Sequence, residues 1–196
     1  MIKHTPLLFL LLFNLLAPTF AAAIDVQISN ITVKEEGREL LLSLKVENAF
    51  HEKLEEAIQN GIPATFSFLI RLERIRNLWP DETVTEFTVT HSLKYHTLKN
   101  HFIITKSWEN NKQMISDSFG EAKQMMSEIN NLKLVNRDRM RTEWRYRVSA
   151  KAELDKVNLP FFLNYIFFFA SMWDFETQWH THEFLYPLPL LKGPEK

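Results

Sequence analysis

The sequence predicts a mainly β protein, an antiparallel meander that forms a β-sandwich or curved sheet of about 7–8 strands, with two amphipathic helices and a short apolar C-terminal helix. Three observations favour this class. Apolar and polar residues alternate with a period of two in several segments, turn residues separate these segments, and only two segments show an apolar stripe at helical spacing. An α+β fold is the alternative class.

The composition limits the classes of function. The chain has 196 residues, of which 45% are hydrophobic and 13% aromatic, as is typical of one globular domain. Its net charge of -1 excludes the broad basic surface that sequence-independent nucleic-acid binding needs, so we expect no nucleic-acid partner. Because the chain contains no cysteine, it can form no disulfide, thiolate metal site or thiol nucleophile.

The first residues have the order of a secretory signal peptide. Lys3 precedes an apolar run at residues 7–16, and the small residues Ala21 to Ala23 follow. The run is about ten residues long, fewer than the roughly 20 that cross a bilayer as a helix, and Pro18 would interrupt such a helix. We therefore expect export to the periplasm, with an uncleaved membrane anchor as the alternative.

These features define the expected domain boundaries. Residues 1–23 are the signal peptide, residues 24–190 a single β-rich extracytoplasmic domain, and residues 191–196 a short tail. No segment after residue 23 has the Ser/Gly composition of a linker.

Four consecutive strands are predicted in the first part of the domain. The first spans residues 62–72, where six residues of one parity are apolar, namely Ile62, Ala64, Phe66, Phe68, Ile70 and Leu72. Residues 87–95 repeat the pattern. Segments 102–108 and 112–116 flank Glu109-Asn110-Asn111, which is typical of a hairpin. Strands in this order predict a meander.

Two segments have the period of an amphipathic helix. In the first, Phe50 to Ile58, we expect Asn48 to cap the amino terminus and Gly61 to close the carboxyl terminus. The second is expected at residues 119–131, where Ser118 begins a capping box.

The longest alternation lies at residues 140–154, and its apolar parity includes Trp144 and Tyr146. Arg145 belongs to the opposite, arginine-rich parity, where cross-strand salt bridges are expected. Trp144→Ala should therefore destabilise the fold by about 3–5 kcal/mol, and Arg145→Ala by less than about 1 kcal/mol unless Arg145 forms an ion pair. A last strand is expected at residues 175–186.

Residues 159–173 form an almost wholly apolar stretch that contains five phenylalanines. The stretch is too short to cross a bilayer, so a short buried helix is one interpretation. The alternative is a surface that lies against a lipid or a partner protein, for which the candidate residues are Phe167, Phe168, Phe169 and Trp173.

Few residues are candidates for chemistry. His180 and His182 lie on the same side of the last predicted strand, as in some metal sites, but no third ligand has a familiar spacing, and exposed strand histidines are the simpler interpretation. His91 lies on the apolar parity of its strand, where a hydrogen-bonded core histidine is expected. No phosphate loop, nucleophile elbow or zinc-protease motif occurs. We therefore expect no catalysis and no bound cofactor.

Several motifs occur in the order found in one known family. They are Gly61-Ile62-Pro63-Ala64-Thr65-Phe66, Arg71-Leu72-Glu73-Arg74 with Trp79 and Asp81, Tyr95-His96-Thr97-Leu98, Tyr146, Leu159-Pro160, and Trp173-Asp174-Phe175 with Trp179. In these motifs the chain resembles domain-of-unknown-function family 4390 (DUF4390), small exported proteins of Gram-negative bacteria. The resemblance implies a cleaved signal and an extracytoplasmic domain. It implies no activity, because the family has no established one.

Three functions remain open on the sequence. The first is a periplasmic interaction or sensing-accessory protein that binds an envelope or membrane protein, with peripheral membrane contact as a further option. The second is a binder of a small apolar ligand. The third is a metal-assisted hydrolase that uses His180 and His182.

Overall fold

A computed structural model describes residues 25–155 and 175–188. Over these residues the chain forms nine strands, two α-helices and two short 3-10 helices. The strands are β1 (Gln27–Glu36), β2 (Glu39–Glu47), β3 (Ala64–Arg74), β4 (Glu82–His96), β5 (His101–Lys106), β6 (Gln113–Ser116), β7 (Glu128–Asn136), β8 (Trp144–Leu154) and β9 (His180–Tyr186). The helices are α2 (Glu52–Gln59), α3 (Phe119–Ser127), η1 (Ser107–Glu109) and η2 (Arg137–Arg139).

The strands form two antiparallel sheets. One has the order β1-β2-β7 and the other the order β6-β5-β4-β3-β8-β9. Strands β3 to β6 are consecutive neighbours, which is the predicted meander. The mainly β class is therefore confirmed.

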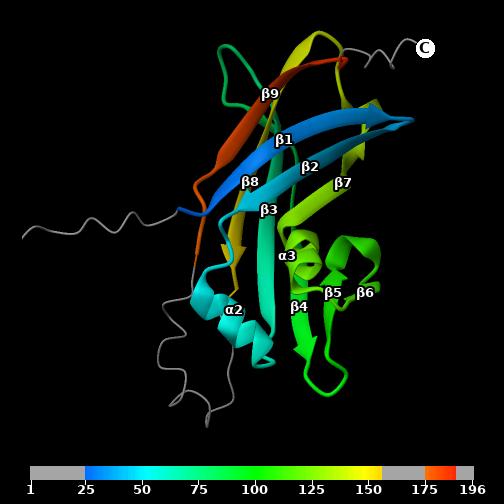
Figure 1. The fold of residues 1–196 in the computed structure, drawn as a ribbon. Helices are drawn as coiled ribbons and strands as arrows, with labels where there is room; N and C mark the ends of the chain where they lie inside the picture. Colours follow the sequence, from blue (N-terminus) through cyan, green and yellow to red (C-terminus); the bar gives the residue numbers. More distant parts are fainter. Residues whose placement is uncertain (1–24, 156–174, 189–196) are drawn as a thin grey trace, which may run out of the picture.

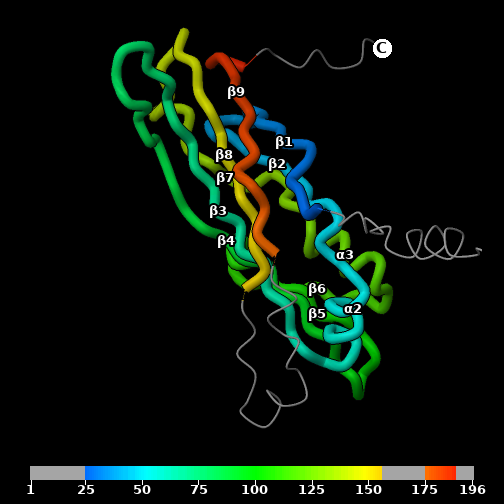
Figure 2. Tube along the Cα trace, turned by 90° about the vertical axis from the view of Figure 1, so that its left-hand side faces the viewer, coloured from blue at the N-terminus to red at the C-terminus, as the bar shows by residue number. Residues whose placement is uncertain are grey.

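The sheets and helices form two layers. In Figure 1 the three-stranded sheet crosses one face of the six-stranded sheet, and α2 and α3 lie on the same side nearer the other end of β3 and β4. Figure 2, turned by 90°, shows β3, β4 and β8 in one layer and β1, β2 and the two helices in the other. One face of the large sheet is thus covered along its length.

The hydrophobic core lies between these layers. In β3 the apolar residues of the predicted parity are all 0% exposed: Ala64, Phe66, Phe68, Ile70 and Leu72. Tyr146 and Val148 of β8 and Leu40 and Leu42 of β2 are equally buried. Removal of this apolar surface from water is the main favourable contribution to the stability of the fold.

Strands β1, β2 and β7 were not predicted. In β2 the buried residues Leu40, Leu42, Leu44 and Val46 alternate with partly exposed ones, apart from the buried Leu41, so the strand has a period of two that was overlooked in the sequence. Strand β7 begins at Glu128 directly after α3, and the predicted helix at residues 119–131 is therefore too long. It ends at Ser127, because pairing of the following residues with β2 replaces another helical turn.

The helix caps are partly as predicted. The cap of α2 is His51 and not Asn48, since His51 Nδ1 accepts a hydrogen bond from Leu54 N at 3.2 Å. Gly61 has a φ of 87°, in the left-handed region that favours glycine after a helix. Ser118 caps α3 as predicted, through a 3.4 Å bond from the backbone N–H three residues on.

The prediction that Trp144 is a core residue is wrong. Trp144 is 37% exposed, whereas Tyr146, two residues along the same parity, is 0% exposed. Trp144 is the first residue of β8, at the end of the sheet, and its ring lies 5.2 Å from the guanidinium carbon of Arg74. A destabilisation as large as that predicted for Trp144→Ala is therefore expected only for substitutions of residues deeper in the sheet.

Other boundaries differ by a few residues. The first meander strand begins at Ala64, two residues later than predicted, and β5 ends at Lys106. The last strand begins at His180, and before it only Glu176 forms an isolated bridge, with Glu153.

Candidate functional site

Seven large hydrophobic residues are exposed among those described, and four of them lie at one end of the molecule. Leu78 is 92% exposed and Trp79 is 75% exposed, both on the loop between β3 and β4. Trp144 begins β8, and Leu185 lies near the end of β9. We call this end the tip, defined as residues 75–81, 143–145 and 185; it is the upper end of the molecule in Figure 1.

The tip contains a surface hollow of about 470 Å³. Its lining combines apolar side chains with arginines: Ile75, Arg76, Asn77, Leu78, Trp79, Glu143, Trp144 and Arg145. Tryptophan and arginine are the residue types that most often dominate binding at protein surfaces. The tip can therefore receive an apolar group, while both of its arginines have carboxylate partners, Arg76 with Glu82 and Arg145 with Glu183.

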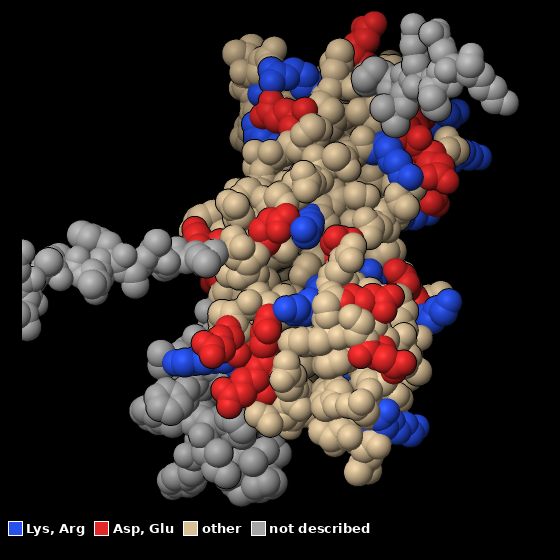
Figure 3. All heavy atoms as spheres, viewed as in Figure 1, with Lys and Arg blue, Asp and Glu red and all other residues tan. Residues whose placement is uncertain are grey.

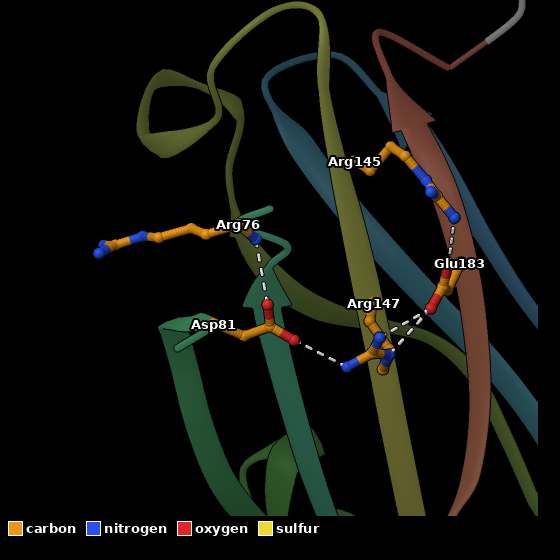
Figure 4. Close-up of polar contacts among 5 residues, drawn as sticks. All are labelled: Arg76, Asp81, Arg145, Arg147 and Glu183. Carbon is orange, nitrogen blue, oxygen red and sulfur yellow. Dashed lines mark hydrogen bonds and ion pairs between the residues drawn. The ribbon is translucent and has the colours of Figure 1, made fainter. Parts of the chain in front are cut away.

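The base of the tip is held by a chain of ionic hydrogen bonds, drawn in Figure 4. Asp81 accepts a bond from Arg76 N at 3.0 Å and another from the Arg147 guanidinium at 2.8 Å. Arg147 also donates to one carboxylate oxygen of Glu183 from Nε and NH2, at 3.0 and 2.9 Å. Arg145 donates to the other oxygen at 2.5 Å. The loop is thus joined through β8 to β9.

These contacts favour the charged forms of Glu183 and Arg147. Hydrogen bonds from Arg147, with its charge and that of Arg145, hold the pKa of the Glu183 carboxyl below its ordinary value. The bond to Glu183 raises the pKa of Arg147, and Asp81 adds to this effect. The cross-strand salt bridges expected for the arginine-rich parity of β8 are therefore present.

Arg74 lies beneath the tip. It is 5% exposed, forms an ion pair with Glu82, and lies under the Trp144 ring. Its Nε has no hydrogen-bond partner within the described part of the chain. Trp144 thus covers a buried cation, which accounts for a tryptophan that is only partly buried.

The residues predicted for chemistry do not converge. His180 and His182 are half-buried on one face of β9, and His180 Nδ1 lies 3.0 Å from Gln178 O. Among the described residues, no three His, Cys, Asp or Glu side chains come together in a group that could hold a metal ion. Phe167, Phe168, Phe169 and Trp173 lie outside the described residues.

His91 is the hydrogen-bonded core histidine that was predicted. It is 0% exposed, its Nδ1 donates to Met126 O at 2.9 Å, and its Nε2 accepts from Trp108 Nε1 at 3.0 Å. Burial lowers the pKa of His91 to about 4, and the nearby charge of Lys106 acts in the same direction. The histidine is therefore a neutral structural group.

Sequence reasoning did not select the tip as a site. Pro80 and Asp81 are residues typical of a turn, and the Asp81 contacts agree with that role. The available signal was the pair Leu78-Trp79 inside this turn, because large apolar residues in a turn between two strands have little of the protein to pack against.

The contacts of Asp81 give a testable prediction. Asp81→Ala removes one bond within the loop and one that ties the loop to β8, and it should lower the free energy of unfolding by about 1–2 kcal/mol. Hydrogen exchange at the Arg76 amide should accelerate more than exchange in the core strands. The matched control is Glu86→Ala, which breaks a solvent-exposed pair with Arg71 on the same sheet and should cost less than about 1 kcal/mol. Unchanged exchange at Arg76 would contradict the role given to Asp81.

A second hollow, of about 500 Å³, lies beside α3. Its charged side chains include Lys123 and Glu55, which pair at 2.6 Å, and Lys45 and Glu47, which pair at 3.2 Å. Figure 3 shows acidic and basic side chains intermixed on the face viewed in Figure 1. This hollow therefore presents charges that already have partners.

No helix within the described ranges is both long and apolar enough to span a bilayer. Comparison with the curated proteins and with the solved structures gave no match. Residues 23–183 match the family model described as Domain of unknown function (DUF4390). The match covers most of the chain and includes the strands that carry the tip, so this protein belongs to the DUF4390 family.

Proposed function

We propose that this protein is a periplasmic interaction domain, without catalysis, that attaches to the cell envelope through its tip. The signal-like first 23 residues support export. The function of such a domain is to hold itself, and any sensing partner, at the envelope.

One observation carries the proposal. Leu78 and Trp79 are 92% and 75% exposed beside a hollow lined by Trp144 and two arginines, while the rest of the described chain buries most of its large apolar side chains. Exposed apolar groups cost solubility, and on a soluble protein a cluster of them marks an interaction surface. The ionic base of the loop supports the same conclusion, because a surface held in place loses little conformational entropy on binding.

The two alternatives have less support. A ligand inside the sheet would need space that Phe66, Phe68 and Tyr146 fill. A hydrolase would need a third metal ligand near His180 and His182, and the described residues supply none.

The test compares two leucines of equal exposure at opposite ends of the molecule. Leu78→Asp should move the protein from the membrane fraction of the envelope to the soluble periplasmic fraction, because a charge replaces an apolar contact, and the attachment constant should fall about tenfold or more. Leu98→Asp, at a residue 93% exposed in the β4–β5 turn, should leave attachment unchanged. Both variants should keep the wild-type melting temperature.

Two results would contradict the proposal. One is that the envelope-bound fraction of the Leu78→Asp variant equals that of the Leu98→Asp variant. The other is a wild-type protein found wholly in the soluble fraction.

A further inference from the structure

We propose that the tip binds directly to a lipid surface that carries anionic headgroups, with Leu78 and Trp79 inserted at the level of the headgroups. This inference rests on the proposed function and adds the identity of the partner. The apolar pair supplies the inserted surface, and the surrounding arginines supply the attraction to the lipid.

The shape of the tip favours lipid over a protein partner. Leu78, at 92% exposure, has almost no contact with its own chain, and Trp79 follows it on the same loop. A protein partner would have to provide a complementary pocket for this protrusion, whereas the fluid boundary of a bilayer accepts it without one. Tryptophan is the side chain most characteristic of that boundary, because its ring is apolar and its N–H remains hydrogen-bonded to water or headgroups.

The charge at this end of the molecule has the sign that anionic lipid requires. Residues 34–39, 74–82, 137–147 and 183–188 hold eight arginines and one lysine against eight carboxylates, a small basic excess, although the whole chain has a net charge of -1. Arg141 is exposed and has no ion pair among the described residues. Each basic residue near an anionic surface contributes about 1 kcal/mol of attraction, so a small excess of arginine is sufficient for reversible binding.

The opposite end lacks arginine among the described residues. Helix α2, at the lower end of Figure 1, contains three glutamates and one lysine, and Lys94 and Lys99 near the β4–β5 turn balance this charge. The apolar pair and the small arginine excess therefore favour binding with the tip toward the membrane and α2 away from it. The hydrogen bonds of Asp81 hold the loop in place for this contact.

The experiment is co-flotation of the protein purified from its host with protein-free vesicles. One set of vesicles contains phosphatidylcholine alone, and the other contains phosphatidylcholine and phosphatidylglycerol in equal parts. The wild-type protein should bind the anionic vesicles about tenfold or more better than the neutral ones, and the difference should shrink as salt screens the arginines.

Matched variants separate the two contributions. Leu78→Asp should lower binding to anionic vesicles about tenfold, and Leu98→Asp should not. Arg141→Glu should lower it about fivefold or more, whereas Lys99→Glu, the same charge change in the distant β4–β5 turn, should have a much smaller effect. All four residues are exposed, so the variants should remain folded.

The outcomes distinguish this inference from the proposed function. If Leu78→Asp releases the protein from native envelopes but the wild type binds no vesicles, the tip binds a protein and the lipid inference is overturned. Vesicle binding that is equal in all variants also overturns it. Loss of both vesicle binding and tip-dependent envelope attachment overturns the inference and the proposed function together.

Discussion

Replacing Phe68 with alanine should lower the free energy of unfolding by about 3–5 kcal/mol, the largest stability loss we expect from one substitution. Phe68 is 0% exposed in the middle of β3, paired with Val89 on one side and Ala152 on the other. The lost apolar contact and the remaining cavity both contribute to the loss. Chemical denaturation of the wild type and the variant measures the difference.

The matched substitution is Trp144→Ala. Because Trp144 is 37% exposed and packs mainly over Arg74, we expect a loss of about 1 kcal/mol. Similar losses for Phe68→Ala and Trp144→Ala would show that the Trp144 side chain is as deeply buried as that of Phe68.

Stability should also fall as the pH is lowered from 6.5 to about 4, through protonation of His91. The pKa of His91 is about 4 in the folded protein and 6.5 in the unfolded chain, so between these values the unfolded chain binds more protons. The contribution of the neutral histidine is fully present above pH 6.5 and is lost as the pH falls, by about 3 kcal/mol in all. A proton on Nε2 would also face the Trp108 N–H, which that nitrogen accepts in the neutral form.

The measurement is the free energy of unfolding against pH for the wild type and for His91→Gln. Glutamine can donate and accept as the neutral imidazole does, but it does not titrate. Exposed carboxylates whose pKa is lowered, such as Glu183, contribute to both curves, so the difference between the curves isolates His91. If the free energies of unfolding of the wild type and of His91→Gln run parallel between pH 6.5 and 4, His91 does not cause the loss of stability.

The two substitutions are not independent. The rings of Phe68 and His91 lie 4.8 Å apart, so the cavity left by Phe68→Ala changes the surroundings of the histidine. A double variant should therefore depart from the sum of the single losses. Water that enters this cavity would weaken the pH dependence.

The large sheet was readable from the sequence because its strands alternate. In β3, Phe66 lies between the polar residues Thr65 and Ser67, and one face is buried along its length. Strand β2 has the same period in Leu40, Leu42, Leu44 and Val46, interrupted by Leu41, and it was overlooked. In β7 the sequence was misleading, because Ile129 completes a helical stripe that pairing with Leu44 overrides. Propensity and period describe the local preference of a segment. The boundary between α3 and β7 is instead determined by the pairing of β7 with β2, a strand distant in the sequence.

The same reasoning explains what was missed at the tip. The hydrogen bond between Arg147 and Asp81 joins residues far apart in the chain, and it depends on the register of β3 with β8. Trp144 has the parity of Tyr146 but lies where the sheet ends. The parity of a residue predicts which face of the strand its side chain lies on. Whether the side chain is buried also depends on which other elements cover that face at that position, and the alternation pattern does not show this.

The pairing of β2 with β7 has a consequence for how the chain folds as it is made. The β1–β2 hairpin is complete when residue 47 emerges, but one side of β2 stays without a partner until β7 follows, because Leu40 pairs with Val135. Until then the hairpin presents an open strand edge beside its apolar residues, the arrangement most prone to aggregation. Contacts over such a separation also slow folding. Nascent chains that end before residue 128 should therefore need a chaperone on this edge.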